Sequence, residues 1–310
     1  MADLILHHYP GSPFSEKVRL ILGFKGMAWR SVIVPAVMPK PDVLALTGGY
    51  RRTPFMQIGA DIYCDSALMC RVIDALQPEP PLYPPATAGL AEIVAQWADS
   101  ALFWAAVPYT MQPAGIVHVL KGATPEMLKA FGADRAAMNP NLRRPTLADG
   151  AAVVQTYFAR LEHLLGDGRP FLLGALPCIA DFSAAQSVWF MRLAPPVVTA
   201  LDAFPKLAGW YERVAAFGPG KFSKMTSAEA IAVAVAAEGR YAPLAFTPEP
   251  GLAQGDAVTV TPTDYAHDAV AGRLVGLCAD EVVIARTDER AGALQVHFPR
   301  IAFQIKPQTP

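Results

Sequence analysis

A serine followed by a proline separates a short apolar run from an amphipathic segment near the start of the chain. Residues 4–6 are Leu-Ile-Leu, and after Ser12 and Pro13 the apolar residues Phe14, Val18 and Ile21 recur at helical spacing. Serine is a preferred N-cap and proline a preferred first helical residue. The pattern therefore predicts a buried strand and then a helix over residues 13–25, ended by a glycine. The N–H groups and dipole at such a helix start favour an anion, and a bound thiolate is one anion that would fit.

The first 76 residues alternate short apolar runs with helical patterns. We expect strands at residues 4–6, 29–34, 55–58 and 62–64, and helices at residues 13–25, 42–46 and 66–76. The order β-α-β-α-β-β-α implies one sheet with helices packed on its faces, and hence an α/β domain over residues 1–76.

The rest of the chain divides into a linker and two further parts. Residues 77–86 are rich in proline and indicate a stiff, extended linker. Residues 87–240 have helical patterns and predict an all-α domain, in which residues 179–193 form a buried central helix. Residues 243–310 alternate in polarity between Gly, Pro and Asp residues, which predicts a small all-β, barrel-like module.

Composition narrows the partners and the compartment. The net charge is −1, which removes the usual electrostatic attraction to nucleic acid, so no nucleic-acid partner is expected. The four cysteines form no C-x-x-C pair, which predicts reduced thiols in a cytoplasmic protein and no bound metal. The N-terminus lacks the pattern of a signal peptide, and no apolar stretch is long enough to cross a membrane.

Four spaced motifs resemble those of the cytosolic glutathione S-transferases of the serine and cysteine type. They are Ser-Pro-Phe-Ser-Glu-Lys-Val-Arg at 12–19, Arg-Thr-Pro-Phe-Met at 52–56, Asp-Ser at 65–66, and Phe-Leu-Leu-Gly at 171–174 with Pro-Cys-Ile-Ala-Asp-Phe at 177–182. The resemblance implies a thioredoxin-like N-terminal domain, an all-helical domain and a homodimer. The C-terminal quarter of the chain lies outside the usual architecture of that family. Cys178 stands where the family has a Ser or Thr helix cap, and Asp181 is expected to complete a structural capping box.

The resemblance also implies a binding site for glutathione as co-substrate. The hydroxyl of Ser12, or that of Ser15 one turn later, would donate a hydrogen bond to the glutathione sulfur. The backbone of Thr53, before a cis-proline at Pro54, would pair with the cysteinyl part of the tripeptide. For both Ser12 and Pro54 a purely structural role, as a helix cap and as an ordinary trans-proline, stays open.

The charged ends of glutathione are assigned by the same resemblance. Asp65 would meet the γ-glutamyl ammonium, and Ser66, expected to be the N-cap of its helix, the γ-glutamyl carboxylate. Arg51 or Arg52 would pair with the glycyl carboxylate, with Lys40 as a weaker candidate. The alternatives are a plain helix cap and a solvated basic turn.

Aromatic residues are candidates for an apolar cleft that holds an electrophile opposite the sulfur. The candidates are Phe14, Trp97, Phe103, Trp104, Tyr109 and Met111. Aromatic side chains at helical spacing are more often core residues, so core packing is the alternative for each.

The expected activity is conjugation of the glutathione thiolate to a small apolar electrophile, a detoxification reaction. One alternative keeps the same site but recycles glutathione, as in an isomerase, a dehalogenase or a thiol reductase. Another is a non-catalytic binding or regulatory protein built on the same scaffold.

Overall fold

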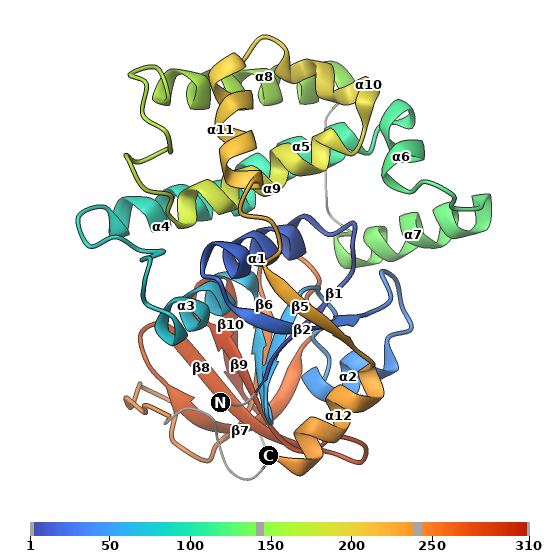
Figure 1. Cartoon of the computed structure of the whole chain (residues 1–310). Coiled ribbons are helices and arrows are strands. Elements are labelled where there is room, and N and C mark those ends of the chain that lie inside the picture. The colour runs from blue at the N-terminus through green and yellow to red at the C-terminus, as the bar shows by residue number, and fades with distance from the viewer. Residues whose placement is uncertain (1–2, 141–145, 238–243, 309–310) are drawn as a thin grey trace.

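The computed structural model describes residues 3–140, 146–237 and 244–308 (Figure 1). The first part of the chain forms seven elements in the expected order. They are β1 (Leu4–His8), α1 (Pro13–Phe24), β2 (Ala28–Ile33), α2 (Pro41–Thr47), β3 (Phe55–Ile58), β4 (Asp61–Cys64) and α3 (Ser66–Leu76). Strand β1 pairs parallel with β2 and antiparallel with β3, and β3 pairs antiparallel with β4. The chain thus begins with the thioredoxin-like arrangement that the sequence predicts.

Local signals explain these boundaries. Ser12 caps α1, and Gly26, just past its end, has φ of 63°, a conformation that glycine adopts at little cost. The expected cap of α3 was wrong by one residue, because the Asp65 carboxylate, and not the Ser66 hydroxyl, accepts the N–H of Ala67. A carboxylate at a helix start gains from the dipole as well as from the hydrogen bond.

A helical domain follows the linker and covers one face of the N-terminal sheet (Figure 1). Its elements are α4 (Ala88–Trp97), η1 (Ala98–Leu102), α5 (Phe103–Thr110), α6 (Pro113–Val119), α7 (Pro125–Met138), α8 (Leu147–Leu164), α9 (Ile179–Arg192), α10 (Pro195–Val198), η2 (Thr199–Leu201) and α11 (Pro205–Ala215). Helix α9 is the predicted central helix, with nearly every residue buried. At its start the Asp181 carboxylate accepts the N–H groups of Cys178, Leu172 and the Trp210 indole, so Asp181 is the structural cap that the sequence predicts.

One strand in the range expected to be helical was not predicted. Residues of β5 (Lys221–Met225) pair parallel with β2 at the edge of the sheet, and α12 (Ser227–Ala236) follows. The ring of Phe222 stacks on Trp29, with centroids 4.9 Å apart. The lysines of β5 are exposed, as is common on edge strands. Because of them, the strand lacks the regular alternation of polar and apolar residues by which a strand is recognised.

The C-terminal module consists of β6 (Ala257–Pro262), β7 (Val270–Leu277), β8 (Glu281–Asp288), β9 (Gly292–Pro299) and β10 (Phe303–Pro307). These strands do not form a separate barrel. They continue the N-terminal sheet, because β9 pairs parallel with β4, and the ten strands have the order β10-β6-β7-β8-β9-β4-β3-β1-β2-β5. The expected boundary between residues 240 and 243 lies outside the described residues.

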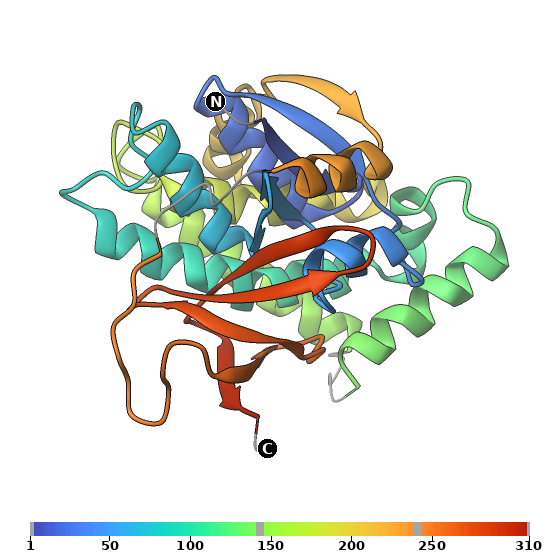
Figure 2. The same cartoon turned by 90° about the horizontal axis from the view of Figure 1, so that it is seen from below.

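The sheet therefore separates two hydrophobic cores. One joins α1 and α3 to the helical domain. The other joins α2 and α12 to the C-terminal strands, and Figure 2 shows both helices beside the red hairpin of β8 and β9. At the seam between β4 and β9, the buried His297 ring contacts the carboxylates of Asp61 at 2.9 Å and Glu281 at 2.7 Å. The module is thus bound to the first domain by backbone pairing, a shared core and buried charge.

Candidate functional site

The start of α1 and the turn before β3 meet at two of the predicted site residues. Ser12 has extended backbone angles, and its hydroxyl accepts the N–H of Ser15 at 3.2 Å and donates to the carbonyl of Thr53 at 3.4 Å. The peptide bond between Thr53 and Pro54 is cis, as predicted. Residues 41 positions apart in sequence are thereby brought into hydrogen-bond contact.

Ser15 occupies a different environment from Ser12. It is fully buried on the inner side of α1, and its hydroxyl has no hydrogen-bond partner within the described residues. Ser12, which is 2% exposed, is the hydroxyl that faces the Thr53 turn. The two serines, which the sequence offered as alternative donors to the sulfur, therefore occupy different environments.

The start of α3 carries a strained residue and a buried cation. Asp65 has φ of 74°, a region that non-glycine residues rarely occupy and that often marks a functional site. Below Ser66 lies the fully buried ammonium of Lys17, 3.5 Å from the Ser66 hydroxyl and 2.5 Å from the Asp99 carboxylate. The Asp99 carboxylate also accepts hydrogen bonds from Ser183 and Gln186 of α9. The helical domain thus supports the Asp65-Ser66 corner from beneath.

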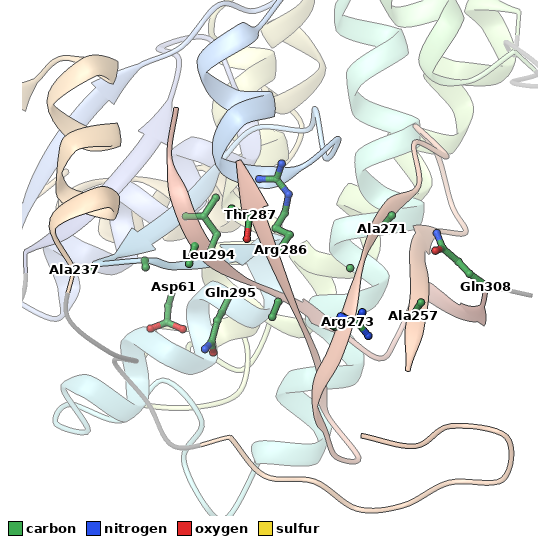
Figure 3. A pocket seen from close by; sticks show the side chains of 14 residues that line it. Asp61, Ala237, Ala257, Ala271, Arg273, Arg286, Thr287, Leu294, Gln295 and Gln308 are labelled. Atoms are coloured by element: carbon green, nitrogen blue, oxygen red, sulfur yellow. The ribbon is translucent and has the colours of Figure 1, made fainter. Parts of the chain in front are cut away.

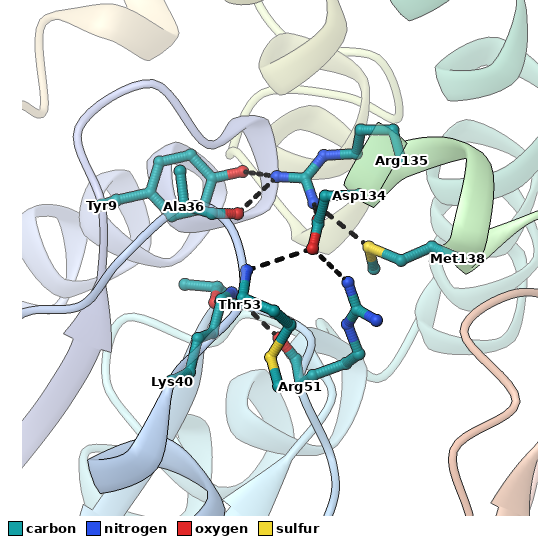
Figure 4. Close-up of polar contacts among 9 residues, drawn as sticks. Tyr9, Ala36, Lys40, Arg51, Thr53, Asp134, Arg135 and Met138 are labelled. Atoms are coloured by element: carbon teal, nitrogen blue, oxygen red, sulfur yellow. Dashed lines mark hydrogen bonds and ion pairs between the residues drawn. The ribbon is translucent and has the colours of Figure 1, made fainter. Parts of the chain in front are cut away.

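Lys40 lies on the other side of Thr53 in a cluster of cations (Figure 4). Its ammonium donates to the Arg51 carbonyl at 3.1 Å and to the Thr53 hydroxyl at 3.3 Å. Arg51 pairs with Asp134 of α7, and Arg135 donates to the same carboxylate at 2.6 Å. Burial lowers the pKa of Lys40 to about 8, and the neighbouring guanidinium groups add to this. Two guanidinium groups thus share one carboxylate, and the Lys40 ammonium beside them has no carboxylate partner of its own among its hydrogen bonds, an imbalance that favours binding of a further anion.

Arg52 is engaged by the C-terminal module and not by solvent. Its guanidinium pairs with the Asp264 carboxylate, and it lies over the ring of Tyr265, 3.8 Å from the centroid. Both partners belong to the loop between β6 and β7. Arg51 and Arg52, the predicted partners of a glycyl carboxylate, are therefore both engaged with protein carboxylates in this structure.

The aromatic candidates divide into two groups. The ring of Phe14 lies against Phe103, with centroids 4.7 Å apart, and Phe103 against Trp104 at 5.1 Å, beside the start of α1. Trp97 instead packs edge-on against Tyr157 of α8, within the helical-domain core. Tyr109 is half-buried and also packs against that core, and Met111 follows the end of α5.

Several residues at this site were not found from the sequence. They are Tyr9, Lys17, Asp99, Asp134, Arg135, Asp264 and Tyr265. Lys17 lies inside the first motif, so its place on the buried face of α1 was a signal that could have been used. The others come from distant segments and carry no local pattern.

A separate hollow of about 690 Å³ lies on the C-terminal strands (Figure 3). Small side chains such as Ala257, Ala271 and Ala293 line it, with Arg273 and Gln308 among them. None of its lining residues is a predicted site residue. In the part of the chain that the structure describes, no group of His, Cys, Asp and Glu side chains is placed to hold a metal ion. No helix among the described residues is long and apolar enough to span a membrane.

Comparison with known proteins agrees with this architecture. Residues 6–81 match the model of the glutathione S-transferase N-terminal domain, and residues 140–213 match that of the C-terminal domain. A GST-like protein from Pseudomonas syringae is 40% identical with a TM-score of 0.82, and the match covers 99% of this chain and 100% of that one. No curated protein matches the chain.

More distant solved structures share the fold over about two thirds of the chain. A glutathione S-transferase from Rhodospirillum rubrum is 21% identical with a TM-score of 0.53, over 68% of this chain and 87% of that one. A glutathione S-transferase from Methylobacterium radiotolerans, solved in complex with glutathione sulfonate, is 18% identical with a TM-score of 0.53, over 72% of this chain and 97% of that one.

Proposed function

Because this chain belongs to the glutathione S-transferase family, we propose that it binds glutathione at the Ser12–Thr53 contact and conjugates it, through its sulfur, to an apolar electrophile. The observation that carries the proposal is that contact itself, in which the cap hydroxyl of α1 lies 3.4 Å from the carbonyl before the cis-proline. A helix start, a hydroxyl donor and the backbone of the half-buried Thr53 then lie within reach of one tripeptide.

The three parts of glutathione are assigned by charge. The Thr53 backbone pairs with the cysteinyl residue, as one strand pairs with another. The Asp65 carboxylate meets the γ-glutamyl ammonium, and Ser66 at the start of α3 meets the γ-glutamyl carboxylate. The glycyl carboxylate is assigned to Lys40, with Arg51 and Arg135 beside it, because these cations outnumber their one carboxylate partner, Asp134.

The reaction needs a thiolate at neutral pH. When glutathione binds, the Ser12 hydroxyl turns its one proton from the Thr53 carbonyl to the sulfur, which frees that carbonyl for the cysteinyl N–H. The dipole of α1 adds to this hydrogen bond, so the pKa of the bound thiol falls below its usual value of about 8.5. A fall of about one to two pKa units corresponds to about 1.4–2.7 kcal/mol of thiolate stabilisation. The thiol proton passes to solvent. The sulfur lone pair then forms a bond to the electrophilic carbon, and the leaving group departs with the electrons of its own bond.

A titration tests the proposal. Thiolate absorbance in the ultraviolet is followed as glutathione is added across the pH range. The expected result is saturable binding with a bound thiol that ionises at lower pH than free glutathione. Absence of binding would overturn the proposal and leave a non-catalytic role for the scaffold.

A thiol-reductase version of the same site is disfavoured, because position 12 holds a serine and three of the four cysteines, Cys64, Cys70 and Cys178, are buried. Burial raises the pKa of Cys70 and of Cys178 to about 12, so both thiols are protonated at neutral pH. Cys64 is fully buried, and its pKa is raised in the same direction. An isomerase or dehalogenase that regenerates glutathione uses the same binding residues, and product analysis separates it from a transferase by whether a stable conjugate accumulates.

We also propose a homodimer in the cytoplasm, with α4 at the interface. The apolar side chains of Leu90 and Ile93 on α4 are 54% and 66% exposed, an unusual position for two large aliphatic residues on one helix. Light scattering during size-exclusion chromatography is expected to give twice the mass of one chain for the wild type. The Ile93→Asp variant is expected to have the mass of a single chain. A wild-type protein of single-chain mass would contradict this assignment.

A further inference from the structure

Tyr265 links the C-terminal module to the helical domain at the proposed site. Its ring lies edge-on to Trp104, with centroids 5.5 Å apart, and its face lies on the guanidinium of Arg52. Trp104 in turn contacts Phe103, which contacts Phe14. Tyr265 therefore connects the row of aromatic side chains on α5 and α1 to the turn before β3.

These contacts form a closed ring. Arg52 immediately precedes Thr53, whose carbonyl accepts the Ser12 hydroxyl, and Ser12 stands two residues before Phe14. Four segments contribute to the ring: the start of α1, helix α5, the loop between β6 and β7, and the turn before β3. Tyr265 is the member of the ring that comes from the C-terminal module.

The loop that carries Tyr265 is held in place on both sides. Asp264 forms an ion pair with Arg52, and the N–H of Ala266 donates to the carbonyl of Met138 at the end of α7, at 2.6 Å. Ala266 has φ of 48°, an unusual conformation for alanine that these contacts maintain. Tyr265 is thus fixed between the first domain and the helical domain, and its position does not depend on a bound ligand.

We infer that Tyr265 forms a wall of the electrophile cleft, so that the C-terminal module selects flat aromatic electrophiles. The inference rests on the proposed function, because the cleft is defined by the glutathione sulfur next to Ser12. A flat ring gains from contact with Phe14, Phe103 and Trp104 and with the part of the half-buried Tyr265 ring that Arg52 and Trp104 leave uncovered. A small aliphatic electrophile has no ring to place against them and gains little from Tyr265.

The test uses two electrophiles, one aromatic and one aliphatic, each with its glutathione product. The electrophiles are chlorodinitrobenzene and iodomethane, and the corresponding products are S-dinitrophenylglutathione and S-methylglutathione. Steady-state kinetics gives kcat/KM for each electrophile, and calorimetry gives the Kd for each product and for glutathione. The product affinities provide a measurement that does not require turnover.

Four full-length variants are compared with the wild type. Tyr265→Ala removes the ring, Tyr265→Leu keeps apolar volume without a ring in case the alanine variant does not fold, and Tyr265→Phe keeps the ring. Asp268→Ala, an exposed residue of the same loop, is the matched control. For Tyr265→Ala or Tyr265→Leu, kcat/KM for chlorodinitrobenzene is expected to fall about tenfold and the Kd of the dinitrophenyl product to rise about tenfold.

The other kcat/KM and Kd values are expected to stay within about twofold of their wild-type values, a difference too small to represent a lost aromatic contact. These are the values for iodomethane, S-methylglutathione and glutathione, and all values for Tyr265→Phe and Asp268→Ala. If glutathione binds and the ring-removing variants keep the wild-type preference for aromatic probes, this inference is wrong while the proposed function stands. If the wild type does not bind glutathione, the proposed function is wrong, and this inference is overturned with it.

Discussion

The ammonium of Lys17 and the carboxylate of Asp99 lie 2.5 Å apart and join the first domain to the helical domain. Lys17 is fully buried, and although burial alone lowers its pKa, the Asp99 carboxylate raises it overall. Asp99 also accepts hydrogen bonds from α9. The buried ammonium of Lys17, next to Ser66, therefore depends on the Asp99 carboxylate for its charge.

Removal of Asp99 is expected to lower the free energy of unfolding. Asp99→Ala leaves the buried Lys17 ammonium without its carboxylate and is expected to destabilise the protein by about 3 kcal/mol. The double variant Lys17→Met/Asp99→Ala should recover part of this loss, because it removes the unpaired charge. Asp3→Ala, which breaks an exposed pair with Arg30, is the control and should cost less than about 1 kcal/mol. Equal losses for the Asp99 and Asp3 variants in chemical denaturation would contradict the buried-pair account.

The two serines of α1 are expected to respond differently to alanine. Ser12→Ala removes the proposed donor to the sulfur and should lower kcat/KM about 10- to 100-fold, with a loss of about 1 kcal/mol in stability from the missing cap. Ser15→Ala removes a buried hydroxyl without a partner among the described residues, so activity should be kept and stability should not fall. A larger activity loss for Ser15→Ala than for Ser12→Ala would reassign the donor.

Affinity for glutathione should depend on the charge of Lys40. The pKa of Lys40 is lowered to about 8, so its ammonium is lost as the pH rises above that value, and affinity for a carboxylate should weaken. S-methylglutathione is the suitable probe, because its sulfur carries no proton. Lys40→Met should raise its Kd about tenfold at neutral pH and flatten the pH dependence above 8. The matched control is Lys224→Met on the exposed strand β5, and an unaltered pH profile in Lys40→Met would refute the assignment.

The seam between the two parts of the sheet should weaken as the pH rises. Burial lowers the pKa of His297, but its hydrogen bonds with Asp61 and Glu281 raise it overall above 6.5. A raised pKa in the folded state gives stability that is complete below 6.5 and is lost as the pH rises through the raised value. Thermal denaturation of the wild type should therefore show a falling Tm in that window, and His297→Gln should be less stable at low pH with a flatter profile. Parallel profiles for the two proteins would exclude His297 as the source.

The sequence predicts the local elements of the first domain well, because their signals are local. Ser12 and Pro13 mark the start of α1, and the apolar runs of β3 and β4 give those strands their bounds. Strand β5 was missed because Lys221 and Lys224 stand on its exposed positions. The join of β9 to β4 was also missed, since alternation shows that a strand exists but not which strand it will pair with.

The site was predicted in outline and not in its charge partners. Ser12, Thr53 and the cis-proline come together as the motifs suggest. The engagement of Arg52 by Asp264 and Tyr265 could not be foreseen, because these residues lie more than 200 positions away in a part of the chain that the family motifs do not cover. Long-range ion pairs leave no periodic pattern in a sequence.

A crystal structure of the protein soaked with glutathione would show whether the Ser12 hydroxyl holds the sulfur. The tripeptide is expected along the Thr53 backbone, with its sulfur within about 3.5 Å of the Ser12 hydroxyl and its γ-glutamyl end at Asp65 and Ser66. A sulfur placed away from Ser12, or density for glutathione at another part of the molecule alone, would contradict this expectation.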